Sequence, residues 1–209
     1  MPHSALFFLA IFAGSYSCHA AIVDDPSPAA ENSDSRKPGP NLIKNASFEA
    51  VKDEMPVGWK KTVWGGKPIY AIENRFGRTG KKCIKISSTD GANASWSFTI
   101  AVKPKTDYRL SAWVKTDSVV STGFGAQVNL HELQFDGKTE AIKGTNGWTR
   151  LSGVFNSGNR SSLLVNCLFG GWGSATGNAW WDDIEVVELI DPVLAMSYDE
   201  KMDFFEAKV

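Results

Sequence analysis

From Asn41 onwards, short runs of alternating polarity are separated by turns rich in Gly, Asn, Asp and Pro. Alternation with a period of two is typical of half-buried strands, and turns at this spacing are typical of antiparallel sandwiches. No segment before residue 197 repeats apolar residues with the period of a helix. The pattern predicts an all-β, two-sheet antiparallel β-sandwich of the jelly-roll type. The predicted strands cover 41–49, 69–73, 83–88, 94–102, 108–115, 125–134, 148–156, 163–169 and 180–189.

The two ends of the chain differ from this middle part. Residues 1–20 are predicted to be a signal peptide, because an apolar run from Ala5 to Ala13 is too short to span a membrane and small residues precede Ala21. The mature protein is therefore expected to be secreted or periplasmic, without a membrane span. A lipoprotein site at Cys18 and a buried terminal strand are less favoured alternatives.

A segment rich in Pro, Ser, Asp and Ala follows, and it contains too little apolar surface to fold. We expect residues 21–40 to be a disordered linker, residues 41–189 to be the sandwich, and residues 190–209 to be a tail. In an exported protein Cys83 and Cys167 could form a disulfide. Strand parity favours two unpaired thiols instead, because Cys167 lies on an apolar face and Cys83 on the face of Lys85.

The composition argues against several classes of function. The 22 Lys and Arg against 23 Asp and Glu give a net charge of -1, which offers no excess charge for a nucleic acid. Of the histidines, only His131 remains after cleavage, so a His-based metal triad is excluded, and no Gly-x-Ser-x-Gly or phosphate-binding loop is present. We expect no catalytic residues in this chain.

Three strands present a second face of amides, hydroxyls and aromatic rings. Planar amides can hydrogen-bond vicinal hydroxyls, and aromatic rings can stack on the apolar faces of sugars. The alternative is an ordinary solvated sheet face, which is also polar. On alternation, the floor of a carbohydrate-binding cleft is predicted to contain Trp113, Gln127, Asn129, His131 and Asn166.

Four motifs in order carry a resemblance to a known family. They are Asn41-Leu-Ile-Lys-Asn-Ala-Ser-Phe-Glu49 with Pro56-Val-Gly-Trp59, then Tyr108-Arg-Leu-Ser-Ala-Trp-Val-Lys115, then Gly147-Trp-Thr-Arg-Leu151, and finally Trp181-Asp-Asp-Ile-Glu-Val186. The chain resembles the jelly-roll carbohydrate-binding modules associated with cellulases and xylanases, which have a galactose-binding-like fold. The resemblance implies a non-catalytic module that binds a polysaccharide or oligosaccharide and serves a glycoside hydrolase in the same polypeptide.

The resemblance also implies a structural calcium ion. The family's acidic positions correspond to Glu49 and Asp182, and backbone carbonyls around Gly80–Lys81 would have to complete the site. The alternative is that Glu49 and Asp182 cap turns or pair with Arg78 or Lys81.

For stacking on a sugar, the best candidates are tryptophans between glycines, because glycine leaves a neighbouring ring uncovered. Trp64 is expected in a Val63-Trp64-Gly65-Gly66 loop, and Trp172 in a Gly170–Gly173 loop. Packing roles are expected for Trp59, Trp96, Trp148 and Trp180, and Trp181 is undecided.

The tail from Asp199 resembles the lead-in to the cytochrome c-like domains of planctomycete proteins, which suggests a missing C-terminal domain; an ordinary frayed helix is the alternative. A second function therefore remains open, that of a structural β-sandwich spacer attached to a cytochrome-like or hydrolase domain. A spacer would bury the rings that a sugar-binding module exposes.

Overall fold

The computed structural model describes residues 35–196 and 200–202. The predicted signal peptide, the linker as far as residue 34 and the end of the tail lie outside the described residues. In the described part almost all regular structure is β, which confirms the predicted fold class. The elements are β1 (Lys37–Pro38), β2 (Val51–Lys52), β3 (Met55–Pro56), β4 (Lys60–Gly66), β5 (Ile69–Asn74), β6 (Lys82–Ala101), β7 (Asp107–Ser121), β8 (Gly125–Leu130), a 3-10 turn (His131–Leu133), β9 (Gly144–Asn156), β10 (Ser162–Gly170), β11 (Ala175–Ile190) and α1 (Pro192–Ala195).

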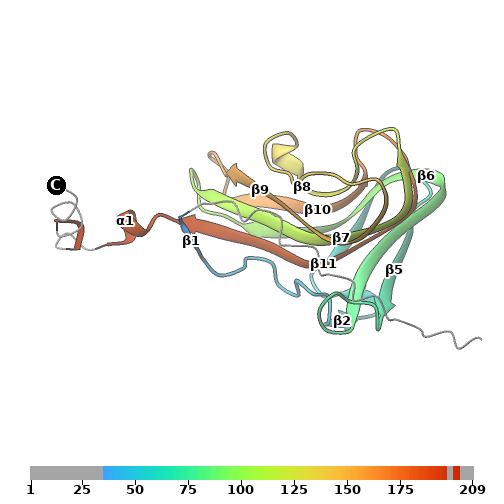
Figure 1. Cartoon of the computed structure of the whole chain (residues 1–209), viewed down its shortest axis with the longest axis horizontal. Helices are drawn as coiled ribbons and strands as arrows, with labels where there is room; N and C mark the ends of the chain where they lie inside the picture. Colours follow the sequence, from blue (N-terminus) through green and yellow to red (C-terminus); the bar gives the residue numbers. More distant parts are fainter. Residues whose placement is uncertain (1–34, 197–199, 203–209) are drawn as a thin grey trace, which may run out of the picture. The chain divides into compact units, whose positions relative to one another are not determined.

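Two layers are formed around the long strand β6, which belongs to both. The first half of β6 pairs with β5 and β11, and β11 continues to β7 and β9. The second half pairs with β4 and β10, and β10 continues to β8. We call these sets the β7 layer and the β10 layer. Figure 1 shows β6 bending at one end of the domain.

The bend in β6 corrects a predicted turn. The predicted strands 83–88 and 94–102 are joined through Asp90-Gly91 into one strand, whose register with β11 shifts between Ser88 and Ala92. Gly91 adopts a φ of 93°, which glycine tolerates without strain. The glycine therefore bends a continuous strand instead of ending it.

The first predicted strand is also wrong. Residues 41–49 contain no strand. Instead, the Asn41 side chain takes the place of a backbone ladder: its Nδ2 donates to the carbonyl of Ile184 and its Oδ1 accepts from the N–H of Val186. Ile43 and Phe48 are buried in the core.

Residues 37–40, assigned to the linker by sequence, belong to the domain, because β1 pairs with the end of β11 and the N–H of Gly39 donates to the carbonyl of Glu188.

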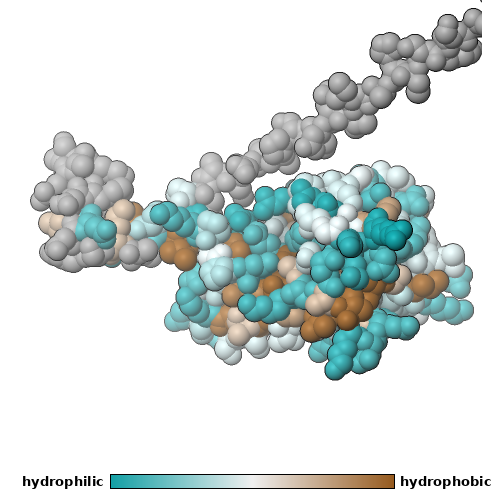
Figure 2. Space-filling view, turned by 90° about the horizontal axis from the view of Figure 1, so that it is seen from below, coloured by the Kyte–Doolittle hydropathy of each residue, from teal (hydrophilic) through white to brown (hydrophobic). Residues whose placement is uncertain are grey.

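The core lies between the layers and contains the residues that alternation places there. Trp96 and Trp181 are completely buried and Trp59 is nearly so, which confirms core packing for Trp59 and Trp96. Trp180 is also nearly buried, but outside this core, where the Lys85 ammonium covers its ring. The undecided Trp181 donates its indole N–H to the carbonyl of Gln127 across the core. Large hydrophobic side chains also reach the surface, and Figure 2 shows hydrophobic areas framed by hydrophilic residues on one face.

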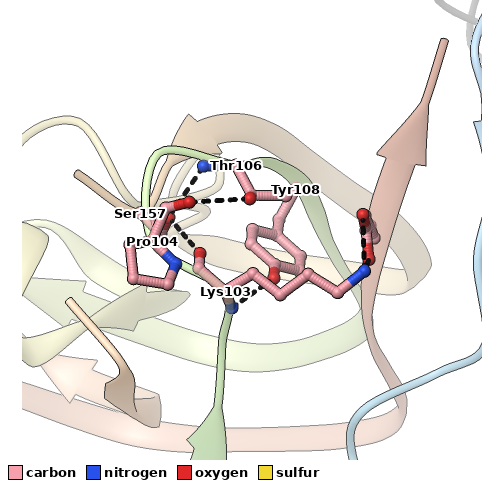
Figure 3. A network of polar contacts seen from close by, with 6 residues as sticks. Lys103, Pro104, Thr106, Tyr108 and Ser157 are labelled. Atoms are coloured by element: carbon pink, nitrogen blue, oxygen red, sulfur yellow. Dashed lines mark hydrogen bonds and ion pairs between the residues drawn. The ribbon is translucent and has the colours of Figure 1, made fainter. Parts of the chain in front are cut away.

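A polar network closes the end of the sandwich at the β6–β7 connection (Figure 3). The backbone N–H of Lys103 donates to the Tyr108 hydroxyl over 2.8 Å, and the Ser157 hydroxyl donates to the Lys103 carbonyl over 2.6 Å. The Lys103 ammonium lies 2.7 Å from Glu188 on β11. These bonds tie the β6–β7 and β9–β10 connections to strands β7 and β11, so the fold is held at this end by specific contacts as well as by burial.

Cys83 and Cys167 are free and buried, as strand parity predicts. Burial raises the pKa of Cys83 to about 12, and the nearby carboxylates of Asp182 and Glu73 act in the same direction. Burial also raises the pKa of Cys167. Thiolates are therefore scarce at neutral pH, which makes both thiols unreactive.

Candidate functional site

A cavity of about 270 Å³ opens on the outer face of the β10 layer. Five of the seven predicted carbohydrate-binding residues line it: Trp64, Asn129, His131, Asn166 and Trp172. Asn93, Gln134, Leu168 and Gly171 complete the lining. These nine residues, all in the described part of the chain, include no Asp, Glu, Lys or Arg. The cavity therefore combines aromatic rings and neutral amides.

The floor of the cavity is a hydrogen-bonded row of side chains that crosses four strands. Asn166 on β10 accepts from the hydroxyls of Ser95 and Ser97 on β6, at 3.2 and 2.9 Å. Its Nδ2 donates to Asn129 on β8 over 3.2 Å. Ser97 also contacts the hydroxyl of Thr62 on β4 at 3.0 Å. Asn166 is thus held in one orientation by its neighbours.

The network leaves donors for a ligand. The side-chain Nδ2 of Asn129 makes no hydrogen bond to any described residue, and the same holds for the Nδ2 of Asn93. The Oδ1 atoms of both amides are occupied, by Asn166 in one case and by the N–H of Gly171 in the other. Because the Oδ1 atom of each amide is held on one side, its Nδ2 atom points to the other side, toward the cavity. The floor therefore offers oriented N–H groups at the base of the cavity.

Trp172 is presented by a tight loop between β10 and β11, as predicted. Its side chain is 65% exposed. Its φ of 55° is unusual for a large residue, and such conformations persist when neighbouring contacts hold them. Here the loop is bonded to residues 122–124: the N–H of Phe124 donates to Gly171 over 3.0 Å, and the N–H of Thr122 donates to Ser174 over 3.0 Å. The exposed ring is therefore held in place from below.

Trp64 reaches the cavity from a strand and not from the predicted loop. It belongs to β4, where the register with β6 shifts between Val63 and Gly65. This bulge explains how residues read as a glycine loop remain in a sheet. The ring is 43% exposed and stacks on the His131 ring, with centroids 6.2 Å apart and planes 6° from parallel. His131 itself begins a 3-10 turn after β8 instead of continuing the predicted strand.

Trp113 is not part of this floor, which corrects the sequence prediction. It lies on β7, in the other layer, with its side chain on the outer face opposite Asp182 of β11. The Arg78 guanidinium covers it, 3.7 Å from the ring centroid. Alternation assigned Trp113 correctly to a polar face, but the two layers have separate polar faces, and sequence parity alone does not distinguish them.

Gln127 is on the correct face of β8 but does not line this cavity. Its side chain is 1% exposed and lines a second cavity beside the first. Its Nε2 has no hydrogen-bond partner among the described residues. Leaving a buried donor unpaired costs about 1–3 kcal/mol, so this amide is an unusual feature of the molecule.

Sequence reasoning missed four lining residues. Asn93 alternates with Ser95 and Ser97 on the outer face of β6, so the period-two pattern contained the signal that would have found it. Leu168 also shares the parity of Asn166. Gln134 follows the 3-10 turn, and Gly171 lies in the loop of Trp172. No periodic signal identifies these two.

The predicted calcium residues bind the 78–82 segment directly. Asp182 Oδ2 accepts the backbone N–H groups of Arg78 and Thr79, at 2.7 and 3.2 Å. Glu49 Oε1 accepts those of Lys81 and Lys82, at 2.7 and 2.8 Å. Within residues 35–196 and 200–202, no group of three metal-ligating side chains occurs. These bonds are the contacts that the turn-capping alternative predicts, and the calcium ion stays a prediction that the family resemblance implies.

The same contacts set the protonation of the two acids in opposite directions. The N–H bonds from Lys82 and Lys81 hold the pKa of Glu49 below its usual value. Burial raises the pKa of Asp182 to about 6, the charge of Asp183 adds to this, and three backbone N–H bonds partly oppose it. Asp182 is therefore the buried acid of this region, whereas Glu49 remains ionised at the surface.

The described residues contain no helix with the length and apolarity needed to cross a membrane. A family model described as "Carbohydrate binding domain" matches residues 40–169. Among curated proteins, the tRNA nuclease WapA of Bacillus subtilis (strain 168) is 26% identical over 187 residues, which cover 81% of this chain and 8% of WapA. The chain thus spans a small fraction of this relative.

Solved structures share the fold. The enzymatically active domain of bacteriophage CBA120 tailspike protein 4 has a TM-score of 0.51 at 16% identity, over 71% of this chain and 21% of that one. The CBM22-1–CBM22-2 tandem of Paenibacillus barcinonensis Xyn10C also has a TM-score of 0.51, at 18% identity, over 75% and 48%. A CBM4 structure has a TM-score of 0.50 at 15% identity, over 70% and 99%.

Proposed function

The chain belongs to this family of carbohydrate-binding domains, and we propose that it binds a polysaccharide in the cavity of the β10 layer. The observation that carries the proposal is the exposure of Trp64 and Trp172 at a cavity whose floor is an ordered amide network. Apolar sugar faces stack on aromatic rings, while hydroxyls bond to amides. Asn93 and Asn129 supply the free N–H groups.

The hydrogen-bond network holds the binding side chains in place before a ligand arrives. Asn166 is held by two serine hydroxyls and by Asn129, so little side-chain freedom is lost when a ligand binds. The lining contains no Asp, Glu, Lys or Arg among the described residues. The proposed ligand is therefore an uncharged glycan, because an acidic or sulfated chain would find no Lys or Arg in the cavity to bind.

We also propose that the domain is a non-catalytic part of a larger exported polypeptide that acts on carbohydrate. The description of the family as a binding domain agrees with a role in attachment. The chain spans 8% of WapA and 21% of the tailspike domain, so related domains occur within longer proteins. The nuclease activity in the name of WapA is not proposed for this chain, which has a net charge of -1.

The alternative of a structural spacer makes a different prediction about the aromatic rings. A spacer has no reason to expose them, whereas Trp172 is 65% and Trp64 is 43% exposed. Large exposed aromatic rings at a cavity are a feature of contact surfaces. The exposure of both rings favours binding over a spacer role.

Affinity electrophoresis tests the proposal. The full chain should be retarded by one class among β-glucan, xylan and mannan, and not by alginate or a sulfated galactan. Trp172→Ala and Trp64→Ala should lose the retardation, while Trp113→Ala, the matched control on the other layer, should keep it. Melting curves establish that each variant is folded. A folded wild type that no polysaccharide retards would refute the proposal and favour the spacer.

A further inference from the structure

A second cavity, of about 360 Å³, lies next to the first. It is open to solvent and is bordered by the segment that follows the 3-10 turn, which runs along the edge of β8 and passes against β9. Bridges join Asn129 to Lys138 and Ala126 to Ile142. The cavity is lined by Phe124, Gln127, Phe135, Asp136, Lys138, Thr139, Glu140, Ala141 and Ser152.

The two cavities share a wall. Phe135 lines the second cavity and stacks on Trp172, which lines the first; their centroids are 5.8 Å apart and their planes 19° from parallel. Phe135 is 68% exposed, so the ring pair stands at the surface between the two openings. Phe124 and Gly171, one from each lining, are also neighbours, since a Cβ at Gly171 would lie 3.3 Å from the Phe124 ring. A chain molecule that stacks on Trp172 therefore passes the mouth of the second cavity.

The second cavity contains polar groups that the fold does not use. Gln127 is 1% exposed, and its Nε2 has no partner among the described residues. Buried polar atoms without partners are rare in proteins and are often found at functional sites. Gln127 lies two residues before Asn129 on the same face of β8, so the unpaired amide continues the row of amides in the first cavity.

The other polar groups complement hydroxyls. The Ser152 hydroxyl makes no hydrogen bond to a described residue, and the Asp136 and Glu140 carboxylates are acceptors at the rim. Lys138 is held over the Phe124 ring, with its Nζ 4.5 Å from the centroid. Thr139 is already used, because its hydroxyl accepts from the N–H of Val128 and donates to the carbonyl of Glu140. Donors and acceptors together suit a polyol, whereas the two carboxylates disfavour an acidic sugar.

We propose that the second cavity is a further sugar subsite, which takes an uncharged monosaccharide unit of the same glycan that stacks on Trp172. This inference rests on the proposed function. In it, Phe135 and Trp172 form a two-ring platform that guides the chain from one cavity to the other, and Gln127 and Ser152 bind hydroxyls of the second unit. Affinity should then increase with chain length until both cavities are filled.

Calorimetry of the full chain with the trisaccharides and hexasaccharides of β-1,4-glucan, β-1,4-xylan and β-1,4-mannan tests this. The wild type should bind the hexasaccharide of one class about tenfold more tightly than the trisaccharide, and the readout is this ratio. Gln127→Leu, which removes the amide and keeps the bulk, should reduce the ratio to about one. Phe135→Ala, at an exposed position, should reduce it in the same direction without unfolding the protein.

Gln134→Ala is the matched control, because Gln134 lines the first cavity. It should weaken both oligosaccharides and preserve their ratio. A wild-type ratio of about one, or an unchanged ratio in both Gln127→Leu and Phe135→Ala, would overturn the second subsite while leaving the proposed function intact. A wild type that binds no oligosaccharide and no polysaccharide would overturn both.

Discussion

The outer faces of the two layers both contain tryptophans, but the rings on the β10 layer are much more exposed than those on the β7 layer. On the β10 layer, Trp64 and Trp172 stand at a cavity with a neutral lining. On the β7 layer, the Arg78 guanidinium lies 3.7 Å from the centroid of Trp113, and the Lys85 ammonium lies 4.9 Å from that of Trp180. Cations over aromatic faces are attractive, so these rings are already occupied by the protein itself.

The difference teaches that a tryptophan on a polar face identifies a binding site only when much of its ring is exposed to solvent. Strand parity places Trp113 and Asn166 on outward faces equally well. The covering groups come from elsewhere in the chain: Arg78 from the β5–β6 connection, and Lys85 from the strand beside Trp180. Long-range contacts therefore decide which of two similar faces is available to a ligand.

The largest effect is expected for a substitution of Gly123, which contacts the Trp172 loop. A Cβ at this position would collide with the backbone carbonyl of Gly171 and would lie 2.7 Å from that of Gly170. Gly123→Ala should lower the free energy of unfolding by about 1–3 kcal/mol and should weaken glycan binding. Gly147→Ala on β9 is the control, because a Cβ there meets nothing within 4 Å. Equal urea midpoints for the two variants would contradict this account.

The next largest effect distinguishes the exposed Trp172 ring from the Trp113 ring, which Arg78 covers. Trp172→Ala should reduce glycan affinity at least about tenfold, which is ~1.4 kcal/mol, with little change in the melting temperature because the ring is 65% exposed. Trp113→Ala should show the reverse pattern, with lower stability and unchanged affinity. Calorimetry and thermal melts measure the two properties separately. Loss of affinity in Trp113→Ala would show that the β7 face also binds the glycan.

A pH effect on stability is expected from the β7 side, where Asp182 is buried. Because its pKa is raised from 3.8 to about 6, the folded state holds a proton that the unfolded state releases. Its contribution to stability is therefore present below about pH 4 and is lost as the pH rises through about 6. The melting-temperature difference between wild type and Asp182→Asn should decrease across this window.

Calcium provides a check on the same residue. A bound cation would favour the ionised carboxylate, so added calcium should reverse the sign of that pH dependence if Asp182 is a ligand. We expect no reversal, because its oxygens accept the N–H groups of Arg78, Thr79 and Asp183. A reversed slope, together with a higher melting temperature in calcium than in chelator, would establish the metal site implied by the family resemblance.

The smallest effect is expected for Arg78, the residue that covers the Trp113 ring. Arg78→Ala should lower stability by about 0.5–1 kcal/mol, because it removes the cation from Trp113, and it should create no glycan binding on that face. Lys67→Ala is the control, since the Lys67 side chain is 83% exposed and its ion-pair partner Asp90 is exposed as well. Chemical denaturation measures both. A stability loss no larger than that of the control would mean that the stacked guanidinium contributes nothing.

The sequence predicts the fold class well because period-two alternation is a local property that the layers preserve. Asn129 and Asn166 were placed correctly on one floor for the same reason. What it does not predict depends on distant contacts. The bend at Gly91 requires both layers, the Asn41 side chain substitutes for a ladder only beside β11, and the position of Gln127 in a second cavity depends on the segment that covers the edge of β8.

The pairing of β1 with the last residues of β11 has a consequence for attachment. Lys37 lies opposite Ile190, so the chain enters and leaves the domain at one point. The Trp172 loop precedes the other end of β11, a strand of 16 residues or roughly 50 Å of extended chain. In the proposed larger polypeptide, both connections would therefore leave from the end of β11 opposite the Trp172 loop, which would keep the proposed binding ring away from a neighbouring domain.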